Sequence, residues 1–193
     1  MTKLPTSLKT FRHSRGYLPH IDGLGLTQFV TFGLADSLPR TFLDDLKYKL
    51  DTNQISEIEY HRASERALDL GDGPVHLQIP EIAGLLKDTL LKFDGERYDL
   101  HAWVLMPNHG HILISPFDGF KLGSLIHSIK SFTANKANSI LGSNGRFWSP
   151  DYFDRYIRNG DHFVRTKRYI EENPVRAHLC TTASEWPWSS ASK

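Results

Sequence analysis

The residues best suited to chemistry lie in one segment, His101 to Pro116, which reads HAWVLMPNHGHILISP. Two apolar stretches flank a Pro107-Asn108 turn, and this pattern predicts a β-hairpin whose second arm begins at His109. Side chains two residues apart on a strand share a face, so His109 and His111 are expected side by side. Two imidazoles held on one rigid face can bind a divalent metal ion. The alternative, in a chain with 10 His, is an ordinary pair of surface or core histidines.

A second set of polar residues lies on the last predicted helix. That helix is expected to begin at Asp161 as its N-terminal cap and to run to about Asn173, where Pro174 stops it. Tyr169 and Asn173 are four residues apart and face the same way, with Arg165 one turn earlier. A phenol attacks a phosphodiester only when it is placed in line and charge on the phosphate is stabilised. A metal ion held by two histidines and an amide oxygen would give that stabilisation. The alternative for Tyr169 is an ordinary aromatic on a helix surface.

The elements that must position these residues follow from the hydrophobic periodicity. Strands are predicted at 28–34, 97–106, 109–115 and 152–158, and helices at 37–50, 79–93, 121–141 and 161–173. Alternation in the second strand places Tyr98, Leu100, Ala102, Val104 and Met106 on one face. Four strands and a central hairpin flanked by helices predict an α+β fold. We expect a ferredoxin-like sandwich, with a four-stranded antiparallel sheet and its helices on one face.

The chain divides into an arm, one domain and a tail. A length of 193 residues suits a single domain with a real core. Residues 1–24 are predicted to be a basic, extended N-terminal arm, and 25–178 the domain, with a polar insertion or long loop at about 51–75. Residues 179–193 are expected to pack on the domain as a C-terminal tail. A single cysteine excludes an intramolecular disulfide and a cysteine-based zinc site.

The charge is distributed unevenly although the net charge is only +1. Residues 36–99 hold 8 Lys/Arg against 14 Asp/Glu, a balance of −6, whereas 120–169 hold 9 against 3, a balance of +6. A half this basic is compatible with a polyanionic partner, although a solvated surface would have the same composition. No run approaches the roughly 18 apolar residues of a membrane helix, and residues 1–20 lack a signal-peptide core. We therefore expect a cytoplasmic protein without a membrane partner, associated with the nucleoid if it binds DNA.

Three ordered motifs over most of residues 97–190 resemble the IS200-like tyrosine transposases, and in particular their REP-associated branch. The motifs read AWVLMPNHGHILI in 101–116, SLIHSIKSFTANKA in 124–137, and FWSPDYFDRYIRNGDHFVRTKRYIEEN from 147 to 173, followed by PVRA. These enzymes belong to the HUH single-strand endonucleases, named for histidine, hydrophobic residue, histidine. The chain departs from that pattern at Gly110, where a bulky hydrophobic residue is usual.

The resemblance implies a fold of the HUH endonuclease type and assigns roles to particular residues. Tyr169 would be the nucleophile, and His109, His111 and Asn173 would hold Mg²⁺ or Mn²⁺. Backbone contacts to DNA are expected from the following basic residues: Lys130, Lys136, Arg155, Arg158, Arg165, Lys167 and Arg168. The implied activity is metal-dependent cleavage and rejoining of single-stranded DNA with hairpins of the REP type, through a 5′-phosphotyrosine.

Two other functions fit the same residues. A domesticated DNA-binding protein of this fold could have lost its chemistry, which Gly110 and the modest net charge favour. An unrelated metal-dependent phosphoesterase could use the histidine pair without needing Tyr169, and it would form no protein–DNA adduct. The sequence is compatible with a monomer that cuts with its own tyrosine or with a homodimer that exchanges the tyrosine helix.

Overall fold

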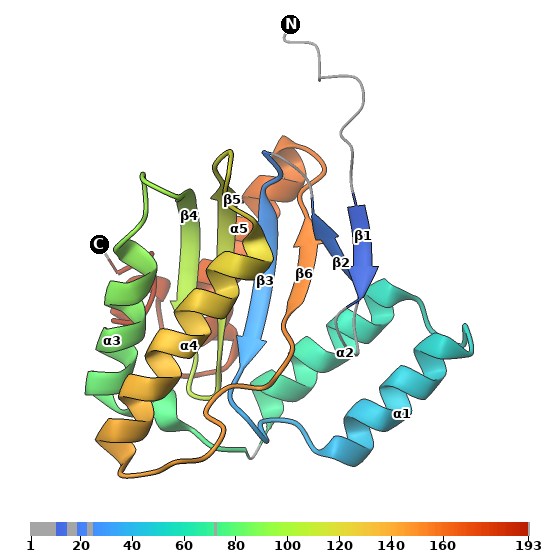
Figure 1. Cartoon of the computed structure of the whole chain (residues 1–193). Helices are drawn as coiled ribbons and strands as arrows, with labels where there is room; N and C mark the ends of the chain where they lie inside the picture. Colours follow the sequence, from blue (N-terminus) through green and yellow to red (C-terminus); the bar gives the residue numbers. More distant parts are fainter. Residues whose placement is uncertain (1–10, 15–18, 23–24, 72, 193) are drawn as a thin grey trace, which may run out of the picture.

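The computed structural model describes residues 11–14, 19–22, 25–71 and 73–192. Its centre is a four-stranded antiparallel sheet in the order β4-β5-β3-β6 (Figure 1). The strands are β3 (Gln28–Gly33), β4 (Tyr98–Leu105), β5 (His109–Pro116) and β6 (Phe153–Tyr156). The helices are α1 (Arg40–Asp51), α2 (Glu57–Leu70), α3 (Pro80–Leu91), α4 (Leu122–Leu141) and α5 (Gly160–Arg176). This architecture confirms the predicted α+β fold with a four-stranded antiparallel sheet.

One face of the sheet, which we call the core face, is covered by α3 and α4 (Figure 1). Apolar side chains of β3 and β5, such as Phe32 and Ile112, pack there against Leu86 of α3 and Ile126 of α4. Pro80 at the first turn starts α3, and Gly142, with φ of +61°, ends α4 in the left-handed conformation that favours glycine. Burial of these apolar stripes makes this face the main hydrophobic core.

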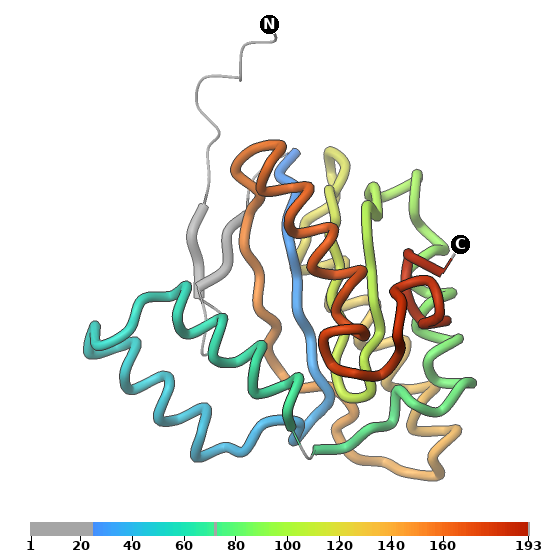
Figure 2. The backbone as a smooth tube through the Cα atoms, turned by 180° about the vertical axis from the view of Figure 1, so that it is seen from behind, coloured from blue at the N-terminus to red at the C-terminus, as the bar shows by residue number. Residues whose placement is uncertain are grey.

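The opposite face, which we call the site face, is crossed by α5 (Figure 2). Ile170 of α5 packs against Phe29, Val104 and Leu113 of the sheet. The prediction that all helices lie on one face was therefore wrong, because α5 adds a layer on the other side. Helices α1 and α2 pack together around Leu46 and Tyr60.

A β-bulge changes the predicted alternation in β4. Leu100 pairs with Ile114, but Ala102 pairs with Leu113, so one extra residue is accommodated at His101. As a result Tyr98 packs in the core-face cluster while Ala102 packs on the site face. The prediction of one shared face from Tyr98 to Met106 was wrong for this reason.

Residues 57–70, inside the stretch predicted as a polar insertion or loop, form the helix α2. Ser56 caps it in a capping box, in which its hydroxyl accepts from the Glu59 N–H while the Glu59 carboxylate accepts from the Ser56 N–H at 2.8 Å. Tyr60 is buried against α1. A polar composition concealed a helix because only a narrow stripe of α2 is apolar.

The ends of α5 also differ from the prediction. Its N-terminal cap is Asn159, whose side chain accepts from the His162 N–H at 2.8 Å, and not Asp161. The helix continues through Pro174 to Arg176. A proline removes one backbone hydrogen bond, and here it lies in the last turn and is buried, so packing offsets the loss.

Both ends of the chain contribute paired backbone. Within the predicted N-terminal arm, β1 (Phe11–Ser14) and β2 (Pro19–Asp22) pair antiparallel, while the rest of the arm lies outside the described residues. In the tail, the Leu105 N–H donates to the Trp188 carbonyl at 2.8 Å, and the Trp186 indole donates to the Leu105 carbonyl at 2.9 Å. The tail thus covers the free edge of β4. Across the described part of the chain, no helix has the length and apolar character needed to span a membrane.

Candidate metal and tyrosine site

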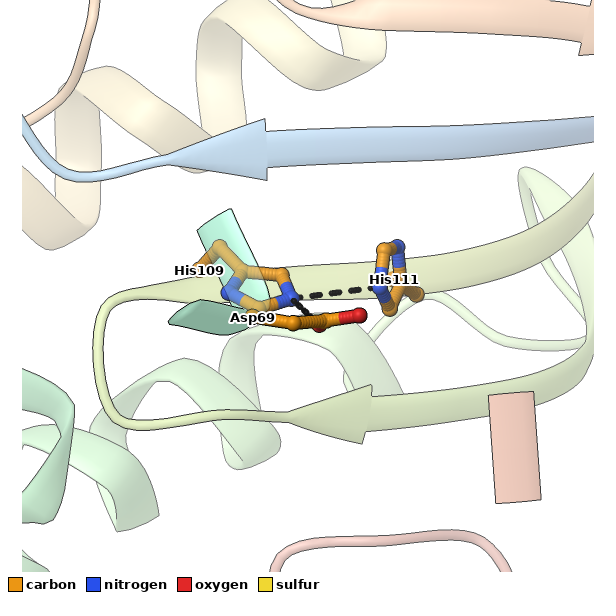
Figure 3. Close-up of side chains that lie close together, drawn as sticks. All are labelled: Asp69, His109 and His111. Atoms are coloured by element: carbon orange, nitrogen blue, oxygen red, sulfur yellow. Dashed lines mark hydrogen bonds and ion pairs between the residues drawn. The ribbon is translucent and has the colours of Figure 1, made fainter. Parts of the chain in front are cut away.

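The β5 strand places both histidines on the site face, as the alternation predicts. His109 and His111 are fully buried, and their Nε2 atoms lie 3.2 Å apart (Figure 3). Two atoms that bind one ion at neighbouring corners of its shell, each at about 2.1 Å, lie about 3 Å apart. The separation therefore suits two ligands of one ion.

Asn108 fixes the orientation of His109. Its Nδ2 donates to the Leu68 carbonyl at 2.8 Å, so its Oδ1 faces the Nδ1 atom of His109, 2.6 Å away. An amide oxygen only accepts, so Nδ1 of His109 must carry the proton. The lone pair of Nε2 is then free for a metal ion, with the second-shell partner typical of metal-binding histidines.

Thr31 gives His111 a corresponding partner. The Thr31 hydroxyl lies 2.8 Å from Nδ1 of His111, because the two residues pair across β3 and β5. Both atoms are buried, and the Phe29 ring stacks on His111 with centroids 5.3 Å apart. The imidazole is thus held with Nε2 toward His109.

The buried imidazoles are kept neutral. Burial lowers the pKa of His109 to about 3, and burial together with the neighbouring His109 and Arg155 lowers the pKa of His111 well below its usual value. Metal binding needs the unprotonated ring, so both side chains are in the required form at neutral pH.

A carboxylate from α2 joins the two histidines. Oδ1 of Asp69 lies 3.5 Å from Nε2 of His109, and the ligand atoms of Asp69, His109 and His111 all lie within 4.8 Å of one another (Figure 3). Burial raises the pKa of Asp69 to about 6, with Arg176 acting in the opposite direction. The contact with His109 is not a salt bridge at neutral pH, because the imidazole is uncharged.

Tyr169 of α5 lies against the same cluster in the same chain. Its ring is tilted over that of His111 with centroids 5.6 Å apart, and it meets Phe29 edge-on at 5.9 Å. Burial, with the carboxylates of Glu65 and Asp69, raises the pKa of Tyr169 above its usual value. The phenol is therefore protonated at neutral pH.

Asn173 lies one turn beyond Tyr169 and is 2% exposed. Its Oδ1 has no hydrogen-bond partner among the residues that the structure describes. A buried acceptor without a partner is costly unless something binds it. Two neutral imidazoles and a nearby carboxylate form a nitrogen and oxygen donor set that fits a divalent ion. The amide oxygen of Asn173 is a further oxygen donor of the type that such ions bind.

Gly110 is accounted for by its neighbour on β3. It faces the core, opposite the two histidines, and a Cβ added there would lie 2.9 Å from Cζ of Phe32. Phe32 is held in turn by an edge-on contact with Trp148. The ring of Phe32 thus occupies the volume that a hydrophobic side chain at 110 would take.

The predicted DNA-contacting residues fall into different places. Three of them lie around the start of α5: Arg155, Arg158 and Arg165. The pKa of His162, in the first turn of that helix, is lowered mainly by burial and further by the positive charges of these three arginines. Arg155 lies over the Phe29 ring on the site face at 4.6 Å. Lys167 and Arg168 form ion pairs with Glu171 and Glu172, one turn along the same helix.

The two lysines of α4 lie on the other side of the sheet. The Lys130 ammonium donates to the carbonyls of Ser149, Pro150 and Asp151 at 2.7, 3.2 and 3.2 Å. All three of its donors are used to hold this loop. Lys136 is exposed on α4, remote from Tyr169 because α4 and α5 cover opposite faces.

Sequence reasoning missed several residues of the site. Asp69 and Glu65 belong to the stretch that received no role, and nothing in their spacing separates them from surface carboxylates. Asn108 lies in the Pro107-Asn108 turn, and its position directly before His109 was the one signal in the sequence for its role. Thr31 could be found only from the pairing of β3 with β5.

Comparison with known proteins finds a family that part of this chain resembles. Residues 82–173 match the family model of the IS200-like transposases. The REP-associated tyrosine transposase of Escherichia coli (strain K12) is 25% identical over 108 residues, which are 55% of this chain and 62% of that protein. The match thus spans less than two thirds of the length of this curated relative.

A solved structure shares the fold. It is described as the REP-associated tyrosine transposase bound to a REP hairpin, and it aligns with 98% of this chain and 82% of its own, at a TM-score of 0.53 and 18% identity. The family match covers β4, β5, α4, β6 and the tyrosine and asparagine of α5, whereas α2 lies outside it. Residues 82–173, a little less than half of the chain, are thus similar to the IS200-like transposases.

Proposed function

We propose that this protein is a metal-dependent endonuclease and transposase for single-stranded DNA. It would cleave and rejoin DNA beside hairpins of the REP type through a phosphotyrosine intermediate. The observation that carries the proposal is the contact of Tyr169 with His111, because it joins a nucleophile to a pair of metal-ready imidazoles within one chain.

The reaction exchanges one phosphodiester for another. The Tyr169 oxygen forms a bond to the scissile phosphorus, and the bond from phosphorus to the 3′ oxygen of the preceding nucleotide breaks. The phenol loses its proton, the departing 3′ oxygen gains one, and the 5′ phosphate stays on the tyrosine. Attack by a 3′-hydroxyl on the phosphotyrosine reverses these steps and rejoins DNA. Bond energy is conserved, so no ATP is needed.

The protein groups around Tyr169 have distinct tasks. His109, His111 and Asn173 would hold the divalent ion, Mg²⁺ or Mn²⁺, which when bound supplies charge stabilisation at the phosphate. Arg176 lies over the Tyr169 ring at 5.0 Å, and Nε of Arg155 is buried without a hydrogen-bond partner in the described part of the chain. Both guanidinium groups act electrostatically on Tyr169, and we propose that they contact the phosphate.

The DNA would approach from the start of α5. Arg155, Arg158 and Arg165 gather there on the site face, and we propose them as backbone contacts. Lys167 and Arg168 would contribute after releasing their glutamates, and Lys136 and Lys130 would contribute least. A hairpin partner is supported by the relative whose structure is described as bound to a REP hairpin.

A single chain contains all the groups of this site. The segment 157–159 between β6 and α5 is short, and α5 returns at once over its own sheet. We propose that the tyrosine acts in the same subunit and that a monomer is sufficient for cleavage.

The test is formation of a covalent adduct. A labelled library of single-stranded hairpins is incubated with the protein in Mn²⁺, in Mg²⁺ or in EDTA, and the products are separated on a denaturing protein gel. We expect a metal-dependent band of protein joined to DNA, which Tyr169→Phe abolishes while binding of the hairpin persists. Tyr48→Phe, at an exposed tyrosine of α1, is the matched control and should leave the band unchanged.

Other outcomes select the alternatives. Hairpin binding without an adduct under any metal would identify a DNA-binding protein that has lost its chemistry. Gly110 no longer favours that reading, because Phe32 fills the space beside it. Cleavage that persists in Tyr169→Phe would identify a phosphoesterase that uses the histidine pair alone.

A further inference from the structure

The last turn of α2 brings a carboxylate to the histidine pair from outside the matched transposase domain. We propose that Asp69 is an anionic metal ligand, so that α2 completes the centre formed by His109, His111 and Asn173. The inference rests on the metal site of the proposed function. It adds a ligand from a second element and predicts that metal binding fixes α2 to the sheet.

The position of Asp69 is built into the fold. The amide of Asn108 orients His109 with its oxygen and holds the Leu68 carbonyl with its nitrogen at 2.8 Å, so one side chain ties both elements together. Just beyond Asp69, the backbone passes close to its neighbours at Gly71. A Cβ there would lie 2.9 Å from the Ala67 carbonyl oxygen and 3.1 Å from that of Ser37. The hydrogen bond from Asn108 and the close backbone contact at Gly71 therefore hold the end of α2 beside the start of β5.

The surroundings of Asp69 favour a cation. Its Oδ1 lies 3.5 Å from an imidazole that burial keeps neutral, and 29% of its side chain is exposed. Glu65, one turn earlier on α2, adds a second carboxylate. Arg176 acts on the Asp69 carboxylate from a distance, but the neutral imidazoles beside it supply no positive charge, and a metal ion bound to both would supply it.

A carboxylate ligand would change what the centre binds. Two imidazoles and an amide are neutral and offer one oxygen, whereas Asp69 adds a negative charge and a second, harder oxygen donor. Mg²⁺ and Mn²⁺ prefer such oxygen ligands. Since Asp69 lies on α2 and the histidines lie on β5, an ion bound to both would also restrain α2.

The test measures Mn²⁺ binding without DNA. Isothermal titration compares the wild type with Asp69→Asn and with Asp44→Asn, an exposed aspartate of α1, as the matched control. We expect Asp69→Asn to weaken Mn²⁺ binding at least about 10-fold and Asp44→Asn to leave it unchanged. His109→Ala should also weaken binding, which ties the measured site to the pair. Asp69→Ser is the second variant, and thermal unfolding in EDTA shows which variants are folded.

Hydrogen exchange gives an independent measurement. Mn²⁺ should slow exchange of the backbone amides of 57–70 in the wild type and not in Asp69→Asn. The inference would be overturned if both folded Asp69 variants bound Mn²⁺ as tightly as the wild type. It would also be overturned if Mn²⁺ left the hydrogen exchange of α2 in the wild type unchanged. Binding that depends on Asp69 in a protein that forms no DNA adduct would sustain the inference and refute the proposed transposition chemistry.

Discussion

The two faces of the sheet are made by the same strands but contain different kinds of residue. On the core face, Phe32, Ile112 and their neighbours pack in an apolar cluster that includes side chains of α3 and α4. On the site face, His109, His111 and Thr31 are as deeply buried but are polar and lie near charged groups. Alternation along β3 and β5 produces both faces at once. One face can therefore supply stability while the other holds polar groups in a strained electrostatic arrangement.

The comparison predicts that truncation on the core face costs the most stability. Leu86→Ala removes a fully buried side chain of α3 and should lower the free energy of unfolding by about 3 kcal/mol. Leu91→Ala, on the same helix but 40% exposed, is the control and should cost far less. Urea denaturation measures both. Equal losses would show that α3 does not hold the core.

On the site face, removing a buried charge should increase stability. Burial raises the pKa of Glu65 from 4.5 to about 7, with Arg155 opposing the change. The folded state therefore binds more protons than the unfolded chain between these pH values. The contribution of this group is present below pH 4.5 and is lost as the pH rises to 7.

Glu65→Gln should accordingly stabilise the protein by about 1 to 3 kcal/mol at pH 8 and have little effect at pH 4.5. Thermal unfolding at the two pH values measures the difference. Glu96→Gln, at an exposed glutamate, is the control and should change the stability at pH 8 by no more than about 0.5 kcal/mol. Loss of stability in Glu65→Gln at pH 8 would mean that the arginines fully compensate the buried carboxylate.

The boundary between the faces can be tested at Gly110. Gly110→Ala places a Cβ 2.9 Å from a Phe32 ring that Trp148 prevents from moving freely, and it should cost about 1 to 2 kcal/mol. Gly84→Ala, where no described atom lies within 4 Å of the new Cβ, should instead stabilise α3 by about 0.5 to 1 kcal/mol. Phe32→Leu should reduce the loss in a double-mutant cycle. If the stability changes of Gly110→Ala and Phe32→Leu were additive, the Phe32 ring would not be the cause of the loss in Gly110→Ala.

The smallest expected effect concerns DNA binding. Arg165→Gln on the site-face side should reduce the salt dependence of hairpin binding. The slope of log K against log salt concentration should become shallower by about one unit. Lys136→Gln on α4 should leave the slope unchanged, although both side chains are exposed. Titrations at several salt concentrations compare them. A larger effect at Lys136 would place the DNA on the core-face side.

The sequence by itself determined the four strands of the central sheet, four of the helices and the shared face of the two histidines. Each depends on local periodicity, and the alternation of His109, Gly110 and His111 is fixed by the geometry of a strand. The four-residue spacing of Tyr169 and Asn173 likewise places both side chains on one face of a helix. The resemblance to a family added their proposed roles.

Only the tertiary structure decided how these pieces meet. Asp69 and Thr31 reach the histidines from α2 and β3, and such long-range contacts leave no periodic signal in the sequence. The bulge at His101 and the continuation of α5 through Pro174 were decided by packing over local preference. Gly110 is the clearest case, since the side chain that explains it, Phe32, lies 78 positions earlier in the chain and beside it in the sheet.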